Sequence, residues 1–180
     1  MRCFDHCLRV GAIFLCLNVG LFLPGTASAQ SGLEQRIADL EAREAIRELI
    51  FAYGHALDHR DFIAFSSLFA REQGTWVGGF GSATGHDAIF KLMDETIGHA
   101  EEPTVPTTHH VFTNIQIDVD GNKADATTKW IFVGSSASAS PEWLFLGHYE
   151  DQFVREDGHW VFLRREAFTD VPTQPESEIP

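Results

Sequence analysis

The stretch that decides the fold is residues 108–135, THHVFTNIQIDVDGNKADATTKWIFVGS. Apolar and polar residues alternate on both sides of Asp120-Gly121-Asn122, which is a tight-turn signal. The same period of two continues further along the chain, where Asp157-Gly158 gives a second turn signal. These patterns predict an antiparallel meander of four strands. The expected strands are Thr108 to Val119, Lys123 to Ser135, Trp143 to Arg155 and His159 to Phe168.

The segment before this sheet has the period of helices. From Leu33 to Leu57 apolar residues recur every three or four positions, with Glu and Arg on the other face. A short helix is expected after Asp61, whose carboxylate can accept hydrogen bonds from the first free amides. A third helix is expected from His86 to Ile97. Between the second and third helices, Gly74 to Gly85 is expected to be a flexible connection around a short apolar piece.

Helices followed by a long antiparallel meander predict an α+β fold in which the helices cover one face of a curved sheet. Long strands wrapped around a long helix leave a cone, and the backbone does not fill its open end. A concave apolar site of this kind is where small molecules bind in most proteins. We therefore expect the functional site at the open end of the cone.

Residues 1–29 are expected to be a signal peptide. Arg2 and Arg9 flank a charged start, Gly11 to Leu23 is an apolar run, and Ala27-Ser28-Ala29 supplies small residues before a cleavage site ahead of Gln30. A membrane-spanning helix needs about 20 apolar residues, so an anchor is the weaker interpretation. The expected product is a periplasmic or secreted protein without stable membrane insertion. Its expected parts are one domain, 30–170, and a flexible tail, 171–180.

Composition narrows the partners of the exported protein. Without residues 1–29 the chain has 11 basic and 25 acidic residues, a formal charge of −14, which the phosphate backbone of a nucleic acid would repel. Cys3, Cys7 and Cys16 all lie in the predicted leader, so the exported protein has neither a disulfide nor a thiolate nucleophile. The strands carry more apolar positions than one cavity and one helix layer can cover. We therefore expect a homodimer or homotrimer that associates through the outer face of the sheet.

Asp58 and one of two adjacent histidines are candidate proton-transfer residues. Asp58 is expected near the carboxyl end of the long helix, where the helix dipole disfavours an anion. The alternative is that the helix has already ended there and Asp58 is a solvated turn residue. His109 and His110 point to opposite faces of their strand, so one of them faces the helices. A carboxylate beside an imidazole orients it and stabilises its charged form. A structural histidine at a strand start is the alternative.

Further candidates would bind the substrate. Tyr53, about a turn and a half before Asp58, can donate a hydrogen bond to a substrate oxygen, although such a tyrosine is more often part of the core. His148 and Tyr149 alternate on one strand, so at most one of them lines the cavity. The aromatic residues expected near the cavity walls are Trp76, Trp130 and Trp143.

No cofactor motif stands out in the sequence. Gly79, Gly81 and Gly85 lack the spacing and the preceding strand of a nucleotide-binding loop. A metal site made of Asp58, one of the adjacent histidines and His148 has unspecific spacing and is the third interpretation. We therefore expect neither a metal nor another cofactor.

Several segments resemble a known family in their order and spacing. They are REAIRELI (43–50), YGHALD (53–58), DF (61–62), LFA (68–70), GHDAI (85–89), THH (108–110) with Asn114, VDG (119–121), GHYED (147–151) and REDGHW (155–160). Together they resemble the SnoaL-like branch of the nuclear transport factor 2-like superfamily, whose relatives include scytalone dehydratase, bile acid dehydratases and ketosteroid isomerases. The resemblance implies a cone-shaped α+β barrel with a deep apolar pocket.

The same resemblance implies a site. Catalytic members of the family use an aspartate at the end of the first helix and a histidine four residues before an asparagine, which correspond to Asp58 and His110. A pocket tyrosine corresponds to Tyr53. Scytalone dehydratase has a further histidine on the next strand, and residues 127–135 have none, which leaves the type of elimination open.

These residues together predict a cofactor-free lyase or isomerase that acts on a hydrophobic, aromatic or polycyclic, small molecule. The competing interpretation is an exported binding protein of the same fold that performs no turnover. A metal-dependent enzyme is the third interpretation.

The leader assignment makes one prediction about stability. Because every cysteine lies within residues 1–29, a reducing agent should leave the melting temperature of the exported protein unchanged. Thermal unfolding with and without reductant measures this. A large drop in melting temperature would contradict the assignment.

Overall fold

The computed structural model describes residues 25–98, 108–135 and 140–172. The first helix, α1 (Gly25–Asp58), contains the predicted segment and begins earlier. The second, α2 (Phe62–Ser67), begins after Asp61, whose Oδ1 accepts a hydrogen bond from the Ala64 amide at 2.9 Å, which confirms the predicted cap. The third, α3 (His86–Ile97), has the predicted bounds.

All the strands lie in one sheet with the order β2-β1-β6-β5-β4-β3. The four predicted strands are present with bounds that differ by at most a few residues. Their hairpins form at the two predicted turns, where Gly121 and Gly158 have positive φ. The strands are β1 (Thr75–Gly78), β2 (Gly81–Thr84), β3 (His109–Asp120), β4 (Lys123–Ser135), β5 (Pro141–Glu156) and β6 (His159–Val171).

The expectation of a flexible connection at residues 74–85 was wrong. This segment forms the β1–β2 hairpin, and β1 pairs in parallel with β6, from Thr75 opposite Arg164 to Val77 opposite Glu166. The sheet is therefore mixed, with one parallel pairing among antiparallel ones. Each strand of this hairpin has four residues, too few to show an alternating pattern, and pairing with the distant β6 holds the hairpin in place.

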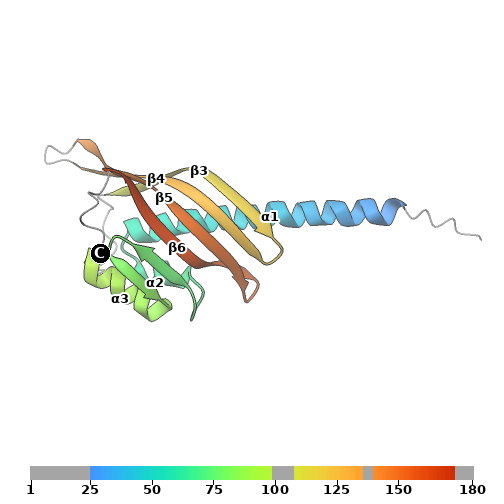
Figure 1. Cartoon of the computed structure of the whole chain (residues 1–180), viewed down its shortest axis with the longest axis horizontal. Helices are drawn as coiled ribbons and strands as arrows, with labels where there is room; N and C mark the ends of the chain where they lie inside the picture. The colour runs from blue at the N-terminus through green and yellow to red at the C-terminus, as the bar shows by residue number, and fades with distance from the viewer. Residues whose placement is uncertain (1–24, 99–107, 136–139, 173–180) are drawn as a thin grey trace, which may run out of the picture.

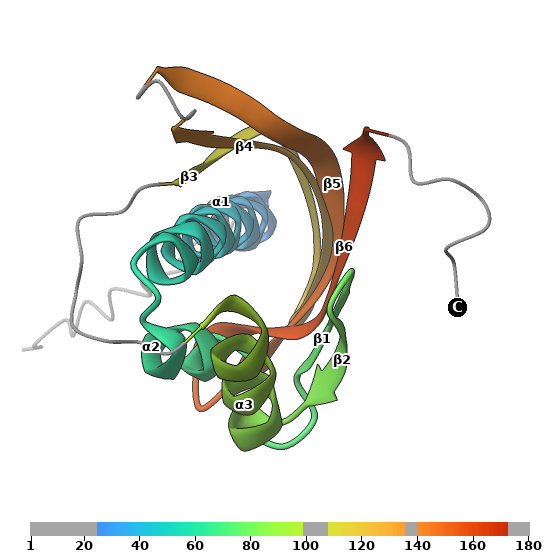
Figure 2. The same cartoon turned by 90° about the vertical axis from the view of Figure 1, so that its left-hand side faces the viewer.

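The sheet curves around the carboxyl-terminal half of α1, and α2 and α3 lie below that helix (Figure 1, Figure 2). The sheet is not closed, because β2 and β3 are edges of the described sheet. The predicted cone-shaped α+β fold is thus confirmed, with an open curved sheet forming its wall. Ile46, Ile50 and Tyr53 of α1 are buried against this sheet.

A bulge in β3 decides which of its side chains face α1. The register of β3 against β4 shifts between Thr113 and Gln116, and Asn114 has a positive φ of 51°. Before the bulge, His110 and Phe112 face inward; beyond it, the inward side chains are Ile115, Ile117 and Val119. Even-numbered side chains face α1 before the bulge and odd-numbered side chains face it after the bulge. The bulge therefore lets the whole length of β3 present apolar residues to α1.

A buried ion pair lies at the centre of the core. Arg165 on β6 donates two hydrogen bonds to Asp151 on β5, at 2.7 and 2.6 Å, and both side chains are fully buried. The guanidinium carbon lies 4.1 Å from the ring centroid of Tyr53 and 4.2 Å from those of Tyr149 and Phe162. Burial raises the pKa of Asp151, against the opposing effect of Arg165. The aromatic faces and Asp151 together compensate for removing the guanidinium from water.

Two predicted regions lie outside the described residues. They are residues 1–24 of the predicted leader and residues 173–180 of the predicted tail. Within the residues that the structure describes, no helix has the length and apolar character required to span a membrane.

The buried ion pair predicts a stability effect with an internal control. Replacing Arg165 by Met leaves the Asp151 carboxylate buried without a partner, which should lower the free energy of unfolding by about 3–5 kcal/mol. The double variant Asp151→Leu/Arg165→Met removes both charges and should be more stable than the single variant. Urea denaturation measures both values. A double variant at least as unstable as Arg165→Met would show that the unpaired carboxylate is not the cause.

Candidate active site

Asp58 and His110 form a hydrogen-bonded pair between the end of α1 and the start of β3. The His110 ring Nδ1 lies 2.6 Å from Asp58 Oδ1, and the His110 backbone N–H donates to Asp58 Oδ2 at 2.9 Å. Their side chains are only 11% and 9% exposed. A carboxylate can only accept hydrogen bonds, so in the neutral ring Nδ1 carries the proton and Nε2 keeps its lone pair. Asp58 is therefore not a solvated turn residue.

Close packing between α1 and β3 permits this short contact. Gly54 lies one turn before Asp58, and a Cβ there would come within 2.5 Å of the Phe112 ring on β3. The absence of a side chain lets β3 approach the helix at the point where His110 reaches Asp58. His109, the neighbouring residue, is exposed. Of the two adjacent histidines, His110 is thus the one that faces the helices.

The pair lies in the wall of a cavity of about 460 Å³. The cavity opens between the end of α1, the β1–β2 hairpin, the end of α3 and the neighbouring ends of β3 to β6. Its walls are largely apolar and aromatic, as expected for the open end of the cone. The lining residues are Tyr53, Leu57, Asp58, Arg60, Trp76, Gly79, Phe80, Ile97, Thr108, His110, Trp130, Phe132, Phe145, Tyr149, Ala167 and Thr169.

Two phenols form a second polar group in this cavity. Tyr53 and Tyr149 are buried with their rings edge to face, 5.5 Å apart. The Tyr53 oxygen accepts a hydrogen bond from the Trp76 indole N–H at 3.0 Å. Burial raises the pKa of Tyr53, and burial together with the neighbouring Tyr53 raises the pKa of Tyr149 well above its ordinary value of 10.0. Both hydroxyls therefore stay protonated at neutral pH.

Three of the five residues proposed for substrate binding line the cavity: Trp76, Trp130 and Tyr149. Trp143 does not, and it is 66% exposed. The pairing of β4 with β5 shifts after Phe132, which stands opposite Phe145, so that Trp143 stands opposite Val133 on the outer face.

His148 also lies outside the cavity, on the other face of β5 from Tyr149. Its Nδ1 makes a hydrogen bond of 2.7 Å with Asp170, and its ring stacks on Phe168. The metal set of Asp58, His110 and His148 is thus not brought together. No other group of three or more possible metal ligands occurs in the described ranges 25–98, 108–135 and 140–172.

Several residues that line the cavity were not predicted from the sequence. Phe132 had a usable signal, because it shares a strand face with Trp130. Phe145 replaces Trp143 because of the shifted register. Phe80 belongs to the unexpected hairpin, where its ring stacks on Trp76. Arg60 has a positive φ of 56° just after α1 and brings a cation to the cavity mouth, which no pattern predicted.

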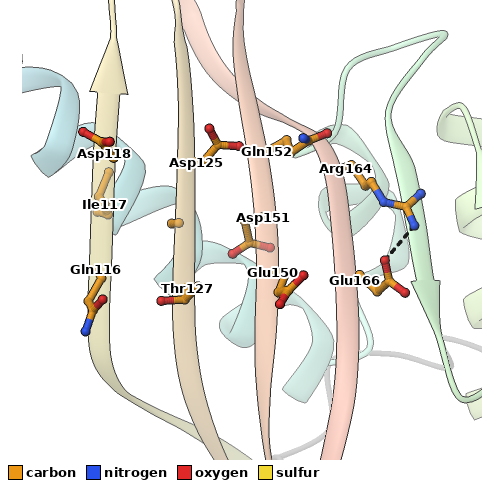
Figure 3. A pocket seen from close by; sticks show the side chains of 11 residues that line it. Gln116, Ile117, Asp118, Asp125, Thr127, Glu150, Asp151, Gln152, Arg164 and Glu166 are labelled. Atoms are coloured by element: carbon orange, nitrogen blue, oxygen red, sulfur yellow. Dashed lines mark hydrogen bonds and ion pairs between the residues drawn. The ribbon is translucent and has the colours of Figure 1, made fainter.

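A second depression, of about 510 Å³, lies on the outer face of the sheet. Four strands supply its lining, and its side chains include Asp118, Asp125, Glu150 and Glu166, with Arg164 paired to Glu166 (Figure 3). It has neither the aromatic walls nor the histidine–carboxylate pair of the first cavity. We therefore place the candidate active site in the cavity that contains His110.

Comparison with solved structures supports this fold. The chain is similar to a nuclear transport factor 2-like protein with a cystatin-like fold from Novosphingobium aromaticivorans, at 27% identity and a TM-score of 0.68, covering 79% of this chain and 91% of that one. A proposed scytalone dehydratase from the same organism is 28% identical with a TM-score of 0.59, covering 74% and 87%. Hexachlorocyclohexane dehydrochlorinase LinA type 2 shares the fold at 20% identity and a TM-score of 0.62, covering 75% and 89%.

Comparison of sequences identifies the family. A search of curated protein sequences finds no match. The sequence profile of the SnoaL-like domain matches residues 38–166, a range that includes the carboxyl-terminal part of α1 with Asp58, the strand carrying His110 and most of the sheet. The chain therefore belongs to the SnoaL-like domain family.

Proposed function

We propose that this protein is a cofactor-independent lyase or isomerase that transfers protons on a hydrophobic small molecule through His110 and Asp58. The observation that carries the proposal is the 2.6 Å contact between His110 Nδ1 and Asp58 Oδ1 in the wall of an aromatic cavity. Structural relatives described as a dehydratase and a dehydrochlorinase support an elimination reaction.

In this proposal His110 is the general base. Asp58 fixes the ring through Nδ1, so Nε2 is the nitrogen left to take a proton from a substrate carbon. In an elimination, the C–H electrons form a carbon–carbon double bond while the hydroxyl on the adjacent carbon leaves; the imidazolium gives its new proton to this hydroxyl, which departs as water and leaves His110 neutral. In an isomerisation, the imidazolium returns the proton to another carbon. The Asp58 carboxylate stabilises the imidazolium in both cases.

The tyrosines would polarise the substrate. Tyr53 already accepts a hydrogen bond from Trp76. Burial is the main cause of the raised pKa of both phenols; the Tyr53 side chain adds to the rise in the pKa of Tyr149, whereas Tyr149 opposes the rise in the pKa of Tyr53. Such a pair of protonated hydroxyls can donate to a carbonyl or hydroxyl oxygen on which negative charge develops. We propose this role for Tyr53 and Tyr149 together.

The cavity walls limit the substrate class. Trp76, Trp130 and Phe132 offer broad aromatic surfaces, and such surfaces favour flat or polycyclic apolar molecules. The cavity volume of about 460 Å³ is within the range of small-molecule sites. We therefore propose a hydroxylated or carbonyl-bearing aromatic, terpenoid or steroid-like substrate.

The export predicted from residues 1–29 is kept as part of the proposal. It rests on the charged start, the apolar run and the small residues before Gln30. The enzyme would then meet its substrate in the periplasm or outside the cell.

The direct test is a reaction survey. The exported protein is incubated with hydrophobic hydroxylated aromatics, terpenes, ketones and chlorinated cyclohexanes, and mass spectrometry follows loss of water, formaldehyde or hydrogen chloride, and chromatography follows isomerisation. The proposal predicts turnover of at least one class. Tight binding without turnover of any class would favour the competing binding-protein function.

Variants of the pair then test the assigned roles. Asp58→Asn removes the charge that favours imidazolium, and His110→Ala removes the base, so each should lower turnover by about 10²–10⁴-fold. The double variant should be little worse than the more damaged single variant, because both act in one step. His109→Ala is the control and should stay active, since His109 is exposed. If His109→Ala were inactive while His110→Ala stayed active, His109 and not His110 would be the base.

The tyrosines make a separate prediction at high pH. Tyr53 and Tyr149 are the two tyrosines of the chain, and both are buried. Because the pKa of each is raised on folding, the unfolded state loses protons first and the free energy of unfolding falls as pH rises above about 10. Tyrosinate absorbance should therefore appear together with the loss of circular dichroism. Ionisation near pH 10 in a fully folded protein would contradict their burial.

A further inference from the structure

The amino-terminal part of α1 lies outside the domain. Residues 30–41, which we call the arm, project beyond the sheet (Figure 1), and all of them except the half-buried Asp39 are exposed. Leu33, Ile37 and Leu40 of the arm are 51%, 46% and 64% exposed. These three large apolar side chains are exposed together on a helix that projects from the domain. Such an exposed apolar patch usually marks a surface that binds a partner.

These three residues form one stripe. Their spacing of four and then three places them at successive core positions of a heptad, with Leu33 and Leu40 at d and Ile37 at a. Since each residue turns a helix by about 100°, the stripe lies almost opposite the face that α1 buries in its own domain. The stripe ends after Leu40, where Glu44 and Arg47 occupy the next core positions and pair with each other.

The charges beside the stripe select one way of pairing. Arg36 is at position g, and Glu34 and Glu41 are at position e. In a parallel pair of helices, g of one chain meets e of the next heptad in the other, so Arg36 would meet Glu41 of the partner subunit. In an antiparallel pair, like positions meet and Arg36 would face the partner subunit's Arg36. Among the described residues, neither Arg36 nor Glu41 has an ion pair or a side-chain hydrogen bond within its own chain.

We propose that the arm pairs in parallel and in register with the arm of a second copy of this chain. The two domains would then lie on the outer sides of the helix pair, because their buried faces point away from the stripe. The open side of α1, where Phe51 is 49% exposed, would lie toward the partner. The seam is short, so the association is expected to be weak.

This inference is independent of the catalytic proposal, since no arm residue lines the cavity. It also differs from association through the outer face of the sheet, the face that the strand pattern favoured. The centre of that face carries Asp118, Asp125, Glu150 and Glu166 (Figure 3), which oppose contact between two identical copies.

Cysteine cross-linking tests the geometry. In the full chain with Cys3, Cys7 and Cys16 replaced by serine, a single Leu33→Cys or Leu40→Cys variant is treated with diamide. Parallel pairing brings each position next to its own copy, within disulfide distance, so both variants should form covalent dimers. Gln35→Cys, on the opposite face of the arm, is the matched control and should not. Cross-linking at neither apolar position, or at only one, would overturn the inference.

Charge exchange tests the pairing without cysteines. Arg36→Glu and Glu41→Arg each place like charges together, so sedimentation equilibrium should show at least a several-fold weaker dimer for either variant. The double variant Arg36→Glu/Glu41→Arg should restore the wild-type association. Leu33→Glu/Leu40→Glu should be monomeric over the same concentrations, with unchanged circular dichroism. Association that persists unchanged in this last variant would place the contact on another face, such as the outer sheet, and overturn the proposal.

Discussion

The two hydrogen bonds from His110 to Asp58 join the end of the longest helix to the start of an edge strand. β3 pairs with β4 on one side only, so its first residues depend on α1 for their second contact. Because one carboxylate accepts from both the backbone and the ring of His110, the position of the strand and the tautomer of the histidine are fixed together. The same interaction lies in the wall of the cavity and orients the group that we propose as its base.

The core beneath the cavity supports this arrangement. Arg165 is buried between the rings of Tyr53, Tyr149 and Phe162 and is neutralised by Asp151. Desolvation of the guanidinium is opposed by the Asp151 carboxylate, which raises the pKa of Arg165 and keeps it charged. The guanidinium packs against the faces of both buried phenols. The cavity therefore has one polar group at Tyr53 and Tyr149 and a second one at Asp58 and His110.

Much of this fold could be predicted from local patterns. Period-two alternation bounded by Asp-Gly turns located β3 to β6, and the capping residue Asp61 located α2. The β1–β2 hairpin was missed because its strands are stabilised by a distant partner, β6. Trp143 was misplaced because a register shift in the β4–β5 pairing leaves no sequence signal.

The site divides in the same way. Asp58, His110 and Tyr53 follow from the family resemblance and from strand alternation, which are properties of short segments. Arg60 and the pairing of Asp151 with Arg165 depend on backbone conformation and on a bulge between Gln152 and Phe153. Such features arise from the packing of whole strands, so a single sequence does not reveal them.

The central claim is that Asp58 holds His110 with Nε2 free to accept a proton. Imidazole ¹⁵N chemical shifts of the wild-type protein measure this without a substrate, and loss of one signal in His110→Gln assigns it among the nine histidines. In the neutral ring, we expect the proton on Nδ1 and an unprotonated Nε2, and this preference should weaken in Asp58→Asn. A neutral His110 with its proton on Nε2 in the wild-type protein would contradict the account.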